Sequence, residues 1–124
     1  LVADDQPVRR ITPLAIVDDM REPLWLYRGI GFALIHNDDP GYVGLRAGHS
    51  HMILCTLAFL RADFRCPEIA ALVGRTLPYV WVRSLDEAKA GHANLIEETE
   101  TRAGTREALV EHGGQWAILA ETAR

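Results

Sequence analysis

Short apolar runs, punctuated by glycine, proline and aspartate, fill the N-terminal half of the chain. The run ITPLAIV (11–17) is rich in β-branched residues, which predicts a strand. Asp18 and Asp19 then offer a helix N-cap, with Glu22 three residues after Asp19 as in a capping box. The helix is expected to end near Gly29 and Gly31. Three further strands with turns between them are predicted at 32–36, 42–46 and 51–56. The pattern therefore indicates one β-α-β-β-β unit.

The same order of elements begins again in the C-terminal half, about 66 residues later when counted from Thr12 to Pro78. LPYVWVR (77–83) has the pattern of a strand, and SLDE (84–87) is a second capping box that should open a helix reaching about Asn94. The strands that close this unit are predicted at 96–101, 105–111 and 115–121. We therefore expect a single domain over residues 1–124, with a first module at about 11–56, a linker at 57–76 that holds a short helix at 67–73, and a second module at about 77–121.

Composition and charge limit the class of protein without naming a function. Of 124 residues, 48% are hydrophobic and 24% are charged, which suits a folded domain. The 13 Lys and Arg against 17 Asp and Glu give a formal charge of -4, so a nucleic-acid partner is not expected, because phosphate binding requires a basic face. No apolar run reaches the roughly 20 residues that span a bilayer, and residues 1–10 do not have the pattern of a signal peptide. We expect a cytoplasmic protein with no membrane partner. In that compartment Cys55 and Cys66 are expected to be reduced thiols, and the alternative is a disulfide or a reactive thiol.

Four segments, in the correct order, resemble the vicinal oxygen chelate superfamily, which includes glyoxalase I, extradiol dioxygenases, fosfomycin-resistance enzymes and bleomycin-resistance proteins. They are DDMREPLWLYRGIGF (18–32), GYVGLRAG (41–48), VRSLDEA (82–88) and GTREALVEHGGQWAILAE (104–121). In the last segment Glu111, His112 and Gly113 stand where the superfamily usually has Asp-Pro-Asp. The resemblance implies an α+β fold, in which two βαβββ modules form a curled mixed sheet, or cup, that a homodimer completes.

Metal-dependent members of the superfamily take one His or Glu/Gln ligand from each of four strands. The resemblance places the matching positions of this chain at Thr12, Leu77, Ile118 and either Ile53 or Leu54. None of these side chains is a ligand of the expected type, so we expect no metal and no other cofactor. Glu121 matches an exposed terminal glutamate of the superfamily instead, and strand alternation turns it away from the face of Ile118.

A slipped alignment is the alternative, because the chain has five histidines: His36, His49, His51, His92 and His112. His49 and His51 stand two residues apart and would share one face of a strand, where they could bind zinc if a third ligand came from elsewhere. The simpler interpretation makes them solvated residues of a turn and a strand end.

The ligand positions of the superfamily also indicate which side chains face into the cup. On this parity the expected ligand pocket comprises Thr12, Leu14, Tyr79, Trp81, Trp116 and Ile118. Aromatic side chains in an apolar pocket bind flat or cationic organic molecules, although an ordinary filled core is the alternative. Glu107 and Glu111 are expected at a solvated edge, from which they could attract a cationic ligand, whereas Arg46 and Arg106 could bind an acidic one. Trp25 is expected to pack on the sheet or on a partner subunit.

These observations favour a metal-free small-molecule binding protein that resembles the bleomycin-resistance proteins. Such a protein would sequester an aromatic or cationic drug-like compound, as in antibiotic resistance, without catalytic residues. Three alternatives stay open: a metal-dependent lyase, isomerase or dioxygenase of the same superfamily; an enzyme without metal that uses a lone His or Glu as general base; and an interaction module with a filled cup. The ligand, and the pairing of the modules within or between chains, are left open by the sequence.

Overall fold

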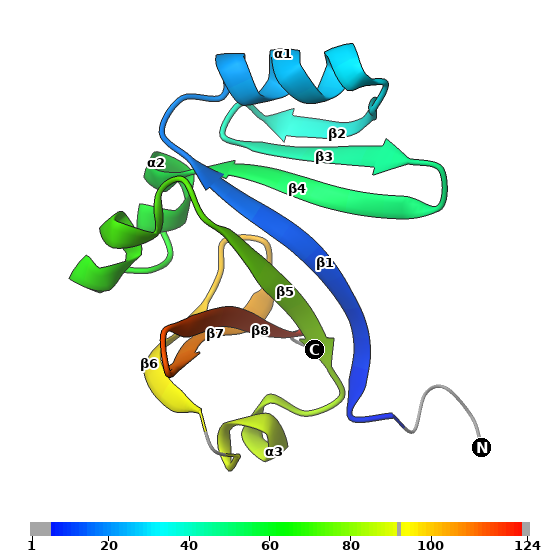
Figure 1. Ribbon diagram of the computed structural model, residues 1–124. Coiled ribbons are helices and arrows are strands. Elements are labelled where there is room, and N and C mark those ends of the chain that lie inside the picture. Colours follow the sequence, from blue (N-terminus) through cyan, green and yellow to red (C-terminus); the bar gives the residue numbers. More distant parts are fainter. Residues whose placement is uncertain (1–5, 92, 123–124) are drawn as a thin grey trace. The chain divides into compact units, whose positions relative to one another are not determined.

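The computed structural model describes residues 6–91 and 93–122, and in these residues the chain forms eight strands, three α-helices and one 3-10 helix (Figure 1). The first module consists of β1 (Val8–Val17), α1 (Arg21–Ile30), β2 (Ala33–Asp39), β3 (Tyr42–Ala47) and β4 (Ser50–Thr56). The second consists of β5 (Thr76–Val82), α3 (Leu85–Lys89), β6 (Asn94–Glu100), β7 (Thr105–His112) and β8 (Gln115–Thr122). Both modules mix parallel with antiparallel strand pairs, which confirms the predicted α+β class and the two βαβββ modules.

The chain divides into two compact units. The N-terminal unit contains Thr12–Ala62 and Pro67–Thr76, and the C-terminal unit contains the described residues from Leu77 onward, Asp63–Cys66 and the described residues up to Ile11. Strand β1 therefore contributes its first residues to one unit and the remainder to the other. No helix within the described residues is long and apolar enough to cross a membrane.

The N-terminal unit is a four-stranded sheet with α1 packed on one face. Its hydrogen-bonded order is β2-β3-β4-β1, in which β1 is parallel to β4 and the other pairs are antiparallel. The cluster on this face consists of the buried residues Ala15, Val43, Leu45 and Leu54, with the partly buried Met20, Leu24, Tyr27, Phe32 and Met52 against them. Full burial of one such aliphatic side chain is worth roughly 1.5–3 kcal/mol, so this apolar stripe is what holds α1 on the sheet.

Helix α1 begins without the side-chain cap that the sequence predicted. Met20 is its N-cap residue and makes no capping hydrogen bond, whereas Asp19 accepts hydrogen bonds from the backbone N–H and the guanidinium group of Arg21. The helix ends at Gly31, as predicted, with a φ of 126° that favours glycine. Trp25 is 76% exposed, so within this chain it does not pack on the sheet as expected.

The segment predicted as a linker holds two short helices, α2 (Leu57–Arg61) and a 3-10 helix, η2 (Pro67–Leu72). The second corresponds to the helix expected at 67–73, and the first has no counterpart in the sequence prediction. Thr56 caps α2, because its hydroxyl accepts a hydrogen bond from the backbone N–H of Phe59 at 3.1 Å. Buried side chains from both helices, Leu60, Ile69 and Leu72, make the segment part of the core.

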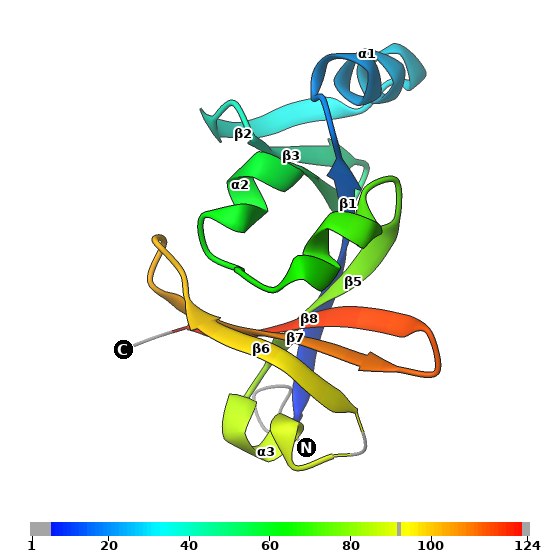
Figure 2. The ribbon, with the colours of Figure 1, turned by 90° about the vertical axis from the view of Figure 1, so that its left-hand side faces the viewer.

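The C-terminal unit orders its strands β5-β8-β7-β6, with β5 parallel to β8 and the other pairs antiparallel (Figure 2). One face packs against α3 through a cluster of buried residues: Val82, Leu85, Ala108 and Val110. The opposite face also carries buried side chains, among them Leu77, Tyr79, Leu109, Ile118 and Ala120. Burial on both faces agrees with the apolar runs of β5 and β8 and of residues 108–110 in β7.

Both cysteines are reduced thiols, as expected. Cys55 is buried in β4 of the N-terminal unit, and Cys66 is half-buried in the C-terminal unit. Neither takes part in a disulfide, so the alternative of a Cys55–Cys66 bond is not met in this structure.

Two side chains fix the start of α3. Ser84 is the N-cap residue, and its hydroxyl accepts a hydrogen bond from the backbone N–H of Glu87, as the capping box predicted. Glu121 of β8 accepts a second hydrogen bond, from the backbone N–H of Leu85 at 2.6 Å. This bond satisfies one of the donors that a helix leaves open at its start, and it ties α3 to the closing strand. The helix ends at Lys89, before the predicted end near Asn94.

Replacing Glu121 by alanine is expected to lower the free energy of unfolding by about 1–2 kcal/mol, because the donor at Leu85 then loses its acceptor. Urea titration of the Glu121→Ala variant measures this loss. Glu100→Ala is the matched control, since Glu100 is an exposed carboxylate of the same unit, and we expect a change below about 0.5 kcal/mol. Equal losses in the two variants would show that the bond to Leu85 has no specific stabilising effect.

Candidate ligand-binding site

The pairing of β5, β8 and β7 places two rows of side chains on the face opposite α3. One row runs along Tyr79, Ile118 and Leu109, and the next along Trp81, Ala120 and Glu107. Paired positions on neighbouring strands share a face, whereas successive residues of one strand alternate, so both rows point to the same side. Aromatic and acidic side chains that are far apart in the sequence are thereby brought together.

Glu107 is a buried carboxylate held by two hydroxyl groups. The residue is 9% exposed, and its Oε2 atom accepts hydrogen bonds from the hydroxyls of Tyr79 at 2.5 Å and Thr105 at 3.0 Å. Burial raises the pKa of the Glu107 carboxyl above its ordinary value, the two hydroxyl donors oppose the rise, and the nearby Asp63 carboxylate adds to it. The solvated position that the sequence suggested for Glu107 is therefore wrong. Glu111, four residues along, is half-buried.

Trp81 is half-buried near the end of β5 and contacts both an aromatic ring and a cation. The centroids of the Trp81 and Tyr79 rings lie 5.6 Å apart with an interplanar angle of 71°, an edge-to-face arrangement. The guanidinium carbon of Arg10 lies 5.6 Å from the centroid of the Trp81 ring, within the range of a cation–π interaction. The backbone N–H of Arg83 donates to the carbonyl of Pro7 at 2.9 Å, which fixes the chain before Arg10 beside the end of β5.

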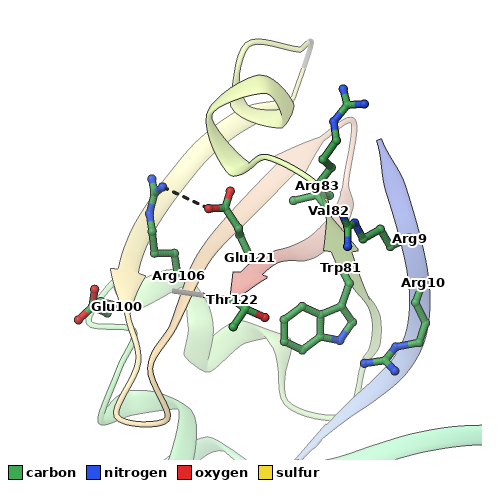
Figure 3. Close-up of a pocket in the computed structure, with 9 residues that line it drawn as sticks. All are labelled: Arg9, Arg10, Trp81, Val82, Arg83, Glu100, Arg106, Glu121 and Thr122. Carbon is green, nitrogen blue, oxygen red and sulfur yellow. Dashed lines mark ion pairs between the residues drawn. The ribbon is translucent and has the colours of Figure 1, made fainter. Parts of the chain in front are cut away.

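An open cavity of about 740 Å³ lies beside Trp81 in the C-terminal unit (Figure 3). Its wall combines one indole ring with side chains of both charges: Arg9, Arg10, Trp81, Val82, Arg83, Glu100, Arg106, Glu121 and Thr122. A volume of this size suits a drug-sized organic molecule. In Figure 3 Arg9 and Arg10 lie on the β1 side of Trp81, whereas Glu100 lies on the side of Arg106.

No protein-family model and no curated protein matches this chain. A solved structure of a glyoxalase/bleomycin resistance protein/dioxygenase superfamily member from Vibrio splendidus 12B01 is similar to it, with a TM-score of 0.56 and 15% identity over 90% of this chain and 97% of that one. A hypothetical protein from Bacillus halodurans C-125 is also similar, with a TM-score of 0.64 and 19% identity over 93% of this chain and 95% of that one. The chain has the fold of the glyoxalase/bleomycin resistance/dioxygenase superfamily. Because one fold hosts many functions, the fold alone does not decide what this protein does.

The six residues predicted to line the superfamily's cup divide between the two units. Thr12 and Leu14 are buried in β1 of the N-terminal unit, with exposed fractions of 8% and 1%. In the C-terminal unit Tyr79 and Ile118 are buried as paired residues of β5 and β8. Trp116 is half-buried on β8, and Trp81 lines the cavity of Figure 3. The sequence thus indicated one wall residue of this cavity, and a ligand contact for the other five stays a prediction.

The residues at the superfamily's metal-ligand positions do not fit a catalytic metal. Thr12, Leu77 and Ile118 are buried apolar or hydroxyl side chains. Ile53 and Leu54 were the two candidates for the fourth position. Ile53 pairs with Leu14 of β1, whereas Leu54 belongs to the buried cluster under α1. None of these four side chains supplies the imidazole or carboxylate that such a site requires.

Within the described residues, the histidines do not group into a metal site in their place. His49 lies in the turn before β4 and His51 lies on that strand, both exposed, so they do not share a strand face as the slipped alignment required. His92 lies outside the described residues. In the described part of the chain no group of three or more His, Cys, Asp or Glu side chains is placed to hold a metal ion.

Two arginines of the cavity wall, Arg9 and Arg10, were not predicted from the sequence. Arg9 and Arg10 precede the strand predicted at 11–17, but β1 already begins at Val8 and carries them along the edge of β5. The β-branched Val8 ahead of these two arginines is the feature of the sequence that could have indicated the earlier start of β1. Of the two arginines considered from the sequence, Arg106 lines the cavity and Arg46 lies on β3 of the other unit.

Glu107→Gln is expected to gain stability relative to the wild type as pH rises from about 4 to about 8. The folded state favours the neutral Glu107 carboxyl, so its contribution is complete below the unfolded-state pKa of 4.5 and is lost as pH rises through the folded-state pKa. Glutamine is neutral throughout and does not carry this loss. Urea unfolding of both proteins at a series of pH values gives the difference.

Two further variants test whether the pH dependence of stability comes from Glu107. Glu100→Gln changes an exposed carboxylate of the same unit and should leave the pH dependence nearly unchanged. Tyr79→Phe removes a hydroxyl that opposes the raised pKa, so it should steepen the loss of stability with pH. A pH-independent difference between wild type and Glu107→Gln would contradict the buried, neutral-favouring carboxyl.

Proposed function

We propose that this protein is a metal-free small-molecule binding protein that sequesters an aromatic, drug-like compound beside Trp81. The observation that carries the proposal is the half-buried indole ring of Trp81 in the wall of a cavity of about 740 Å³. An aromatic wall with a few polar groups around it is how small organic ligands are usually held. Tyr79 supports the indole edge-on from the buried face, which keeps the ring in place for stacking.

Ring stacking alone sets a limit on affinity. An aromatic group buries about 150–250 Å², which at roughly 25 cal/mol per Å² contributes about 4–6 kcal/mol. Association costs at least about 4 kcal/mol in lost translational and rotational freedom. The ring by itself therefore gives weak binding, and the charged side chains of the cavity wall must supply the rest.

We further propose a cytoplasmic homodimer in which both modules belong to a single domain, as the resemblance implies. The N-terminal unit leaves several apolar side chains exposed on α1 and the edge strand β2: Trp25, Leu26, Ile30, Leu34 and Ile35. Apolar side chains beside an unpaired strand edge favour association with another chain. Sedimentation velocity at several protein concentrations tests the oligomeric state.

Binding of N-phenyl-1-naphthylamine, a neutral fluorescent aromatic compound, is expected to be saturable and to depend on Trp81. Trp81→Leu should weaken it by about tenfold or more, equivalent to about 1.4 kcal/mol, because the stacking surface is lost. Dye fluorescence and tryptophan quenching measure the dissociation constant. The matched control is Trp25→Leu, which removes a more exposed tryptophan from the other unit.

The two tryptophan variants discriminate between sites. Weakened binding in Trp81→Leu with unchanged binding in Trp25→Leu supports the cavity. The reverse result would place the dye on the exposed surface of α1 around Trp25 and would overturn the proposed site. Circular dichroism and thermal unfolding confirm that each variant is folded before its binding is compared.

Metal content is expected to be far below one ion per chain after incubation with Zn, Ni, Mn or Fe(II) and dialysis, because the superfamily's ligand positions lack ligand side chains. Elemental analysis of tag-free protein measures it. Stoichiometric metal would contradict the assignment of Thr12, Leu77 and Ile118 to those positions. It would favour instead a metal-dependent lyase, isomerase or dioxygenase.

A further inference from the structure

The wall of the Trp81 cavity carries more positive than negative side chains. Four guanidinium groups, from Arg9, Arg10, Arg83 and Arg106, face two carboxylates, from Glu100 and Glu121. This local excess is opposite in sign to the formal charge of -4 of the whole chain. The charge that a ligand meets therefore depends on which of these groups already have partners inside the protein.

Two of the arginines are engaged by carboxylates outside the cavity wall. Arg106 donates to Glu98 at 2.8 Å and to Asp86 at 3.2 Å. Arg83 pairs with Glu87, four residues along the chain, at 2.7 Å. Their charges are largely compensated before any ligand arrives, and they serve mainly to hold α3 and β6 to the sheet.

Arg10 differs from these two because its guanidinium group lies over an aromatic ring. Its guanidinium carbon lies 5.6 Å from the centroid of the Trp81 ring, and the residue is exposed. Arg9 lies next to it on β1, on the same side of Trp81 in Figure 3. Glu100, the exposed carboxylate of the wall, lies across the cavity from them. A ring stacked on Trp81 would consequently meet a guanidinium group at the β1 side.

We infer that the compound bound beside Trp81 carries an anionic group, such as a carboxylate or a sulfonate, next to its aromatic ring, and that Arg10 pairs with that group. The inference rests on the proposed function of the cavity and deepens it by naming the ligand class. A guanidinium fork matches the paired oxygens of such a group, and the arrangement combines stacking with a charge-assisted hydrogen bond. A cationic ligand would meet Arg10 at the same place and would be disfavoured by it.

The test compares two probes that differ by one sulfonate group: 1-anilinonaphthalene-8-sulfonate and the neutral N-phenyl-1-naphthylamine. We expect the sulfonate to bind the wild type about tenfold more tightly than the neutral compound. Arg10→Gln should remove most of this preference, because the affinity for the sulfonate should fall much more than the affinity for the neutral probe. Raising the salt concentration from about 0.02 M to about 0.5 M should weaken the sulfonate alone, because salt screens charge pairs. Arg46→Gln, an exposed strand arginine of the other unit, is the matched control and should bind both probes like the wild type.

The outcomes separate the ligand class from the proposed function. Equal affinities for the two probes, both lost in Trp81→Leu, would overturn the anionic ligand and leave the aromatic site in place. An equal loss of sulfonate binding in Arg10→Gln and Arg46→Gln would also overturn it, because the attraction would then be non-specific. Binding of neither probe through Trp81 would overturn the proposed function itself.

Discussion

The parallel pairing of β5 with β8 is the constraint on which the candidate site depends. It sets Tyr79 beside Ile118 and Trp81 beside Ala120, and the antiparallel partner β7 then continues the second row to Glu107. Alanine in the middle of that row leaves space above the sheet, so that the Tyr79 hydroxyl reaches the Glu107 carboxyl across it. A one-residue slip of β8 would exchange its two faces and would separate these groups. The aromatic wall and the buried acid are thus consequences of a single register.

Side chains on the α3 face of the same strands contribute to the wall of the cavity. Glu121 alternates with Ala120, turns toward α3 and accepts the hydrogen bond from the N-terminus of that helix. Arg106 alternates with Glu107 in the same way and reaches the carboxylates on α3 and β6. The residues that fasten α3 to the sheet therefore form one wall of the cavity, and Trp81 with the β1 arginines forms another. Stability and the proposed ligand binding share these side chains, so a substitution at Glu121 or Arg106 is expected to act on both.

Periodicity was sufficient to predict the strands and the faces of their side chains, because alternation is a local property of the backbone. It predicted that Glu121 points away from the face of Ile118, and it indicated two βαβββ modules. It did not predict the burial of Glu107, since the hydroxyl that makes burial tolerable belongs to Tyr79, 28 residues away on another strand. Helix α2 was missed because its cap, Thr56, is also the last residue of β4. A partner distant in the sequence accounts for the first difference, and the overlap of strand end and helix cap accounts for the second.

Glu107 and Glu111, which the sequence suggested could attract a cationic ligand, do not line the Trp81 cavity, so the charge of its wall comes from other side chains. In salt solution of physiological strength a charge is screened over about 8 Å, so a ligand senses the groups around it and not the total. In the C-terminal unit Glu98 and Asp86 pair with Arg106, and Glu87 pairs with Arg83, so these acids do not offer their charge to the cavity. What faces a ring on Trp81 is the guanidinium of Arg10. Composition therefore gives the charge of the whole chain, whereas ion pairing decides the sign of the charge at one cavity.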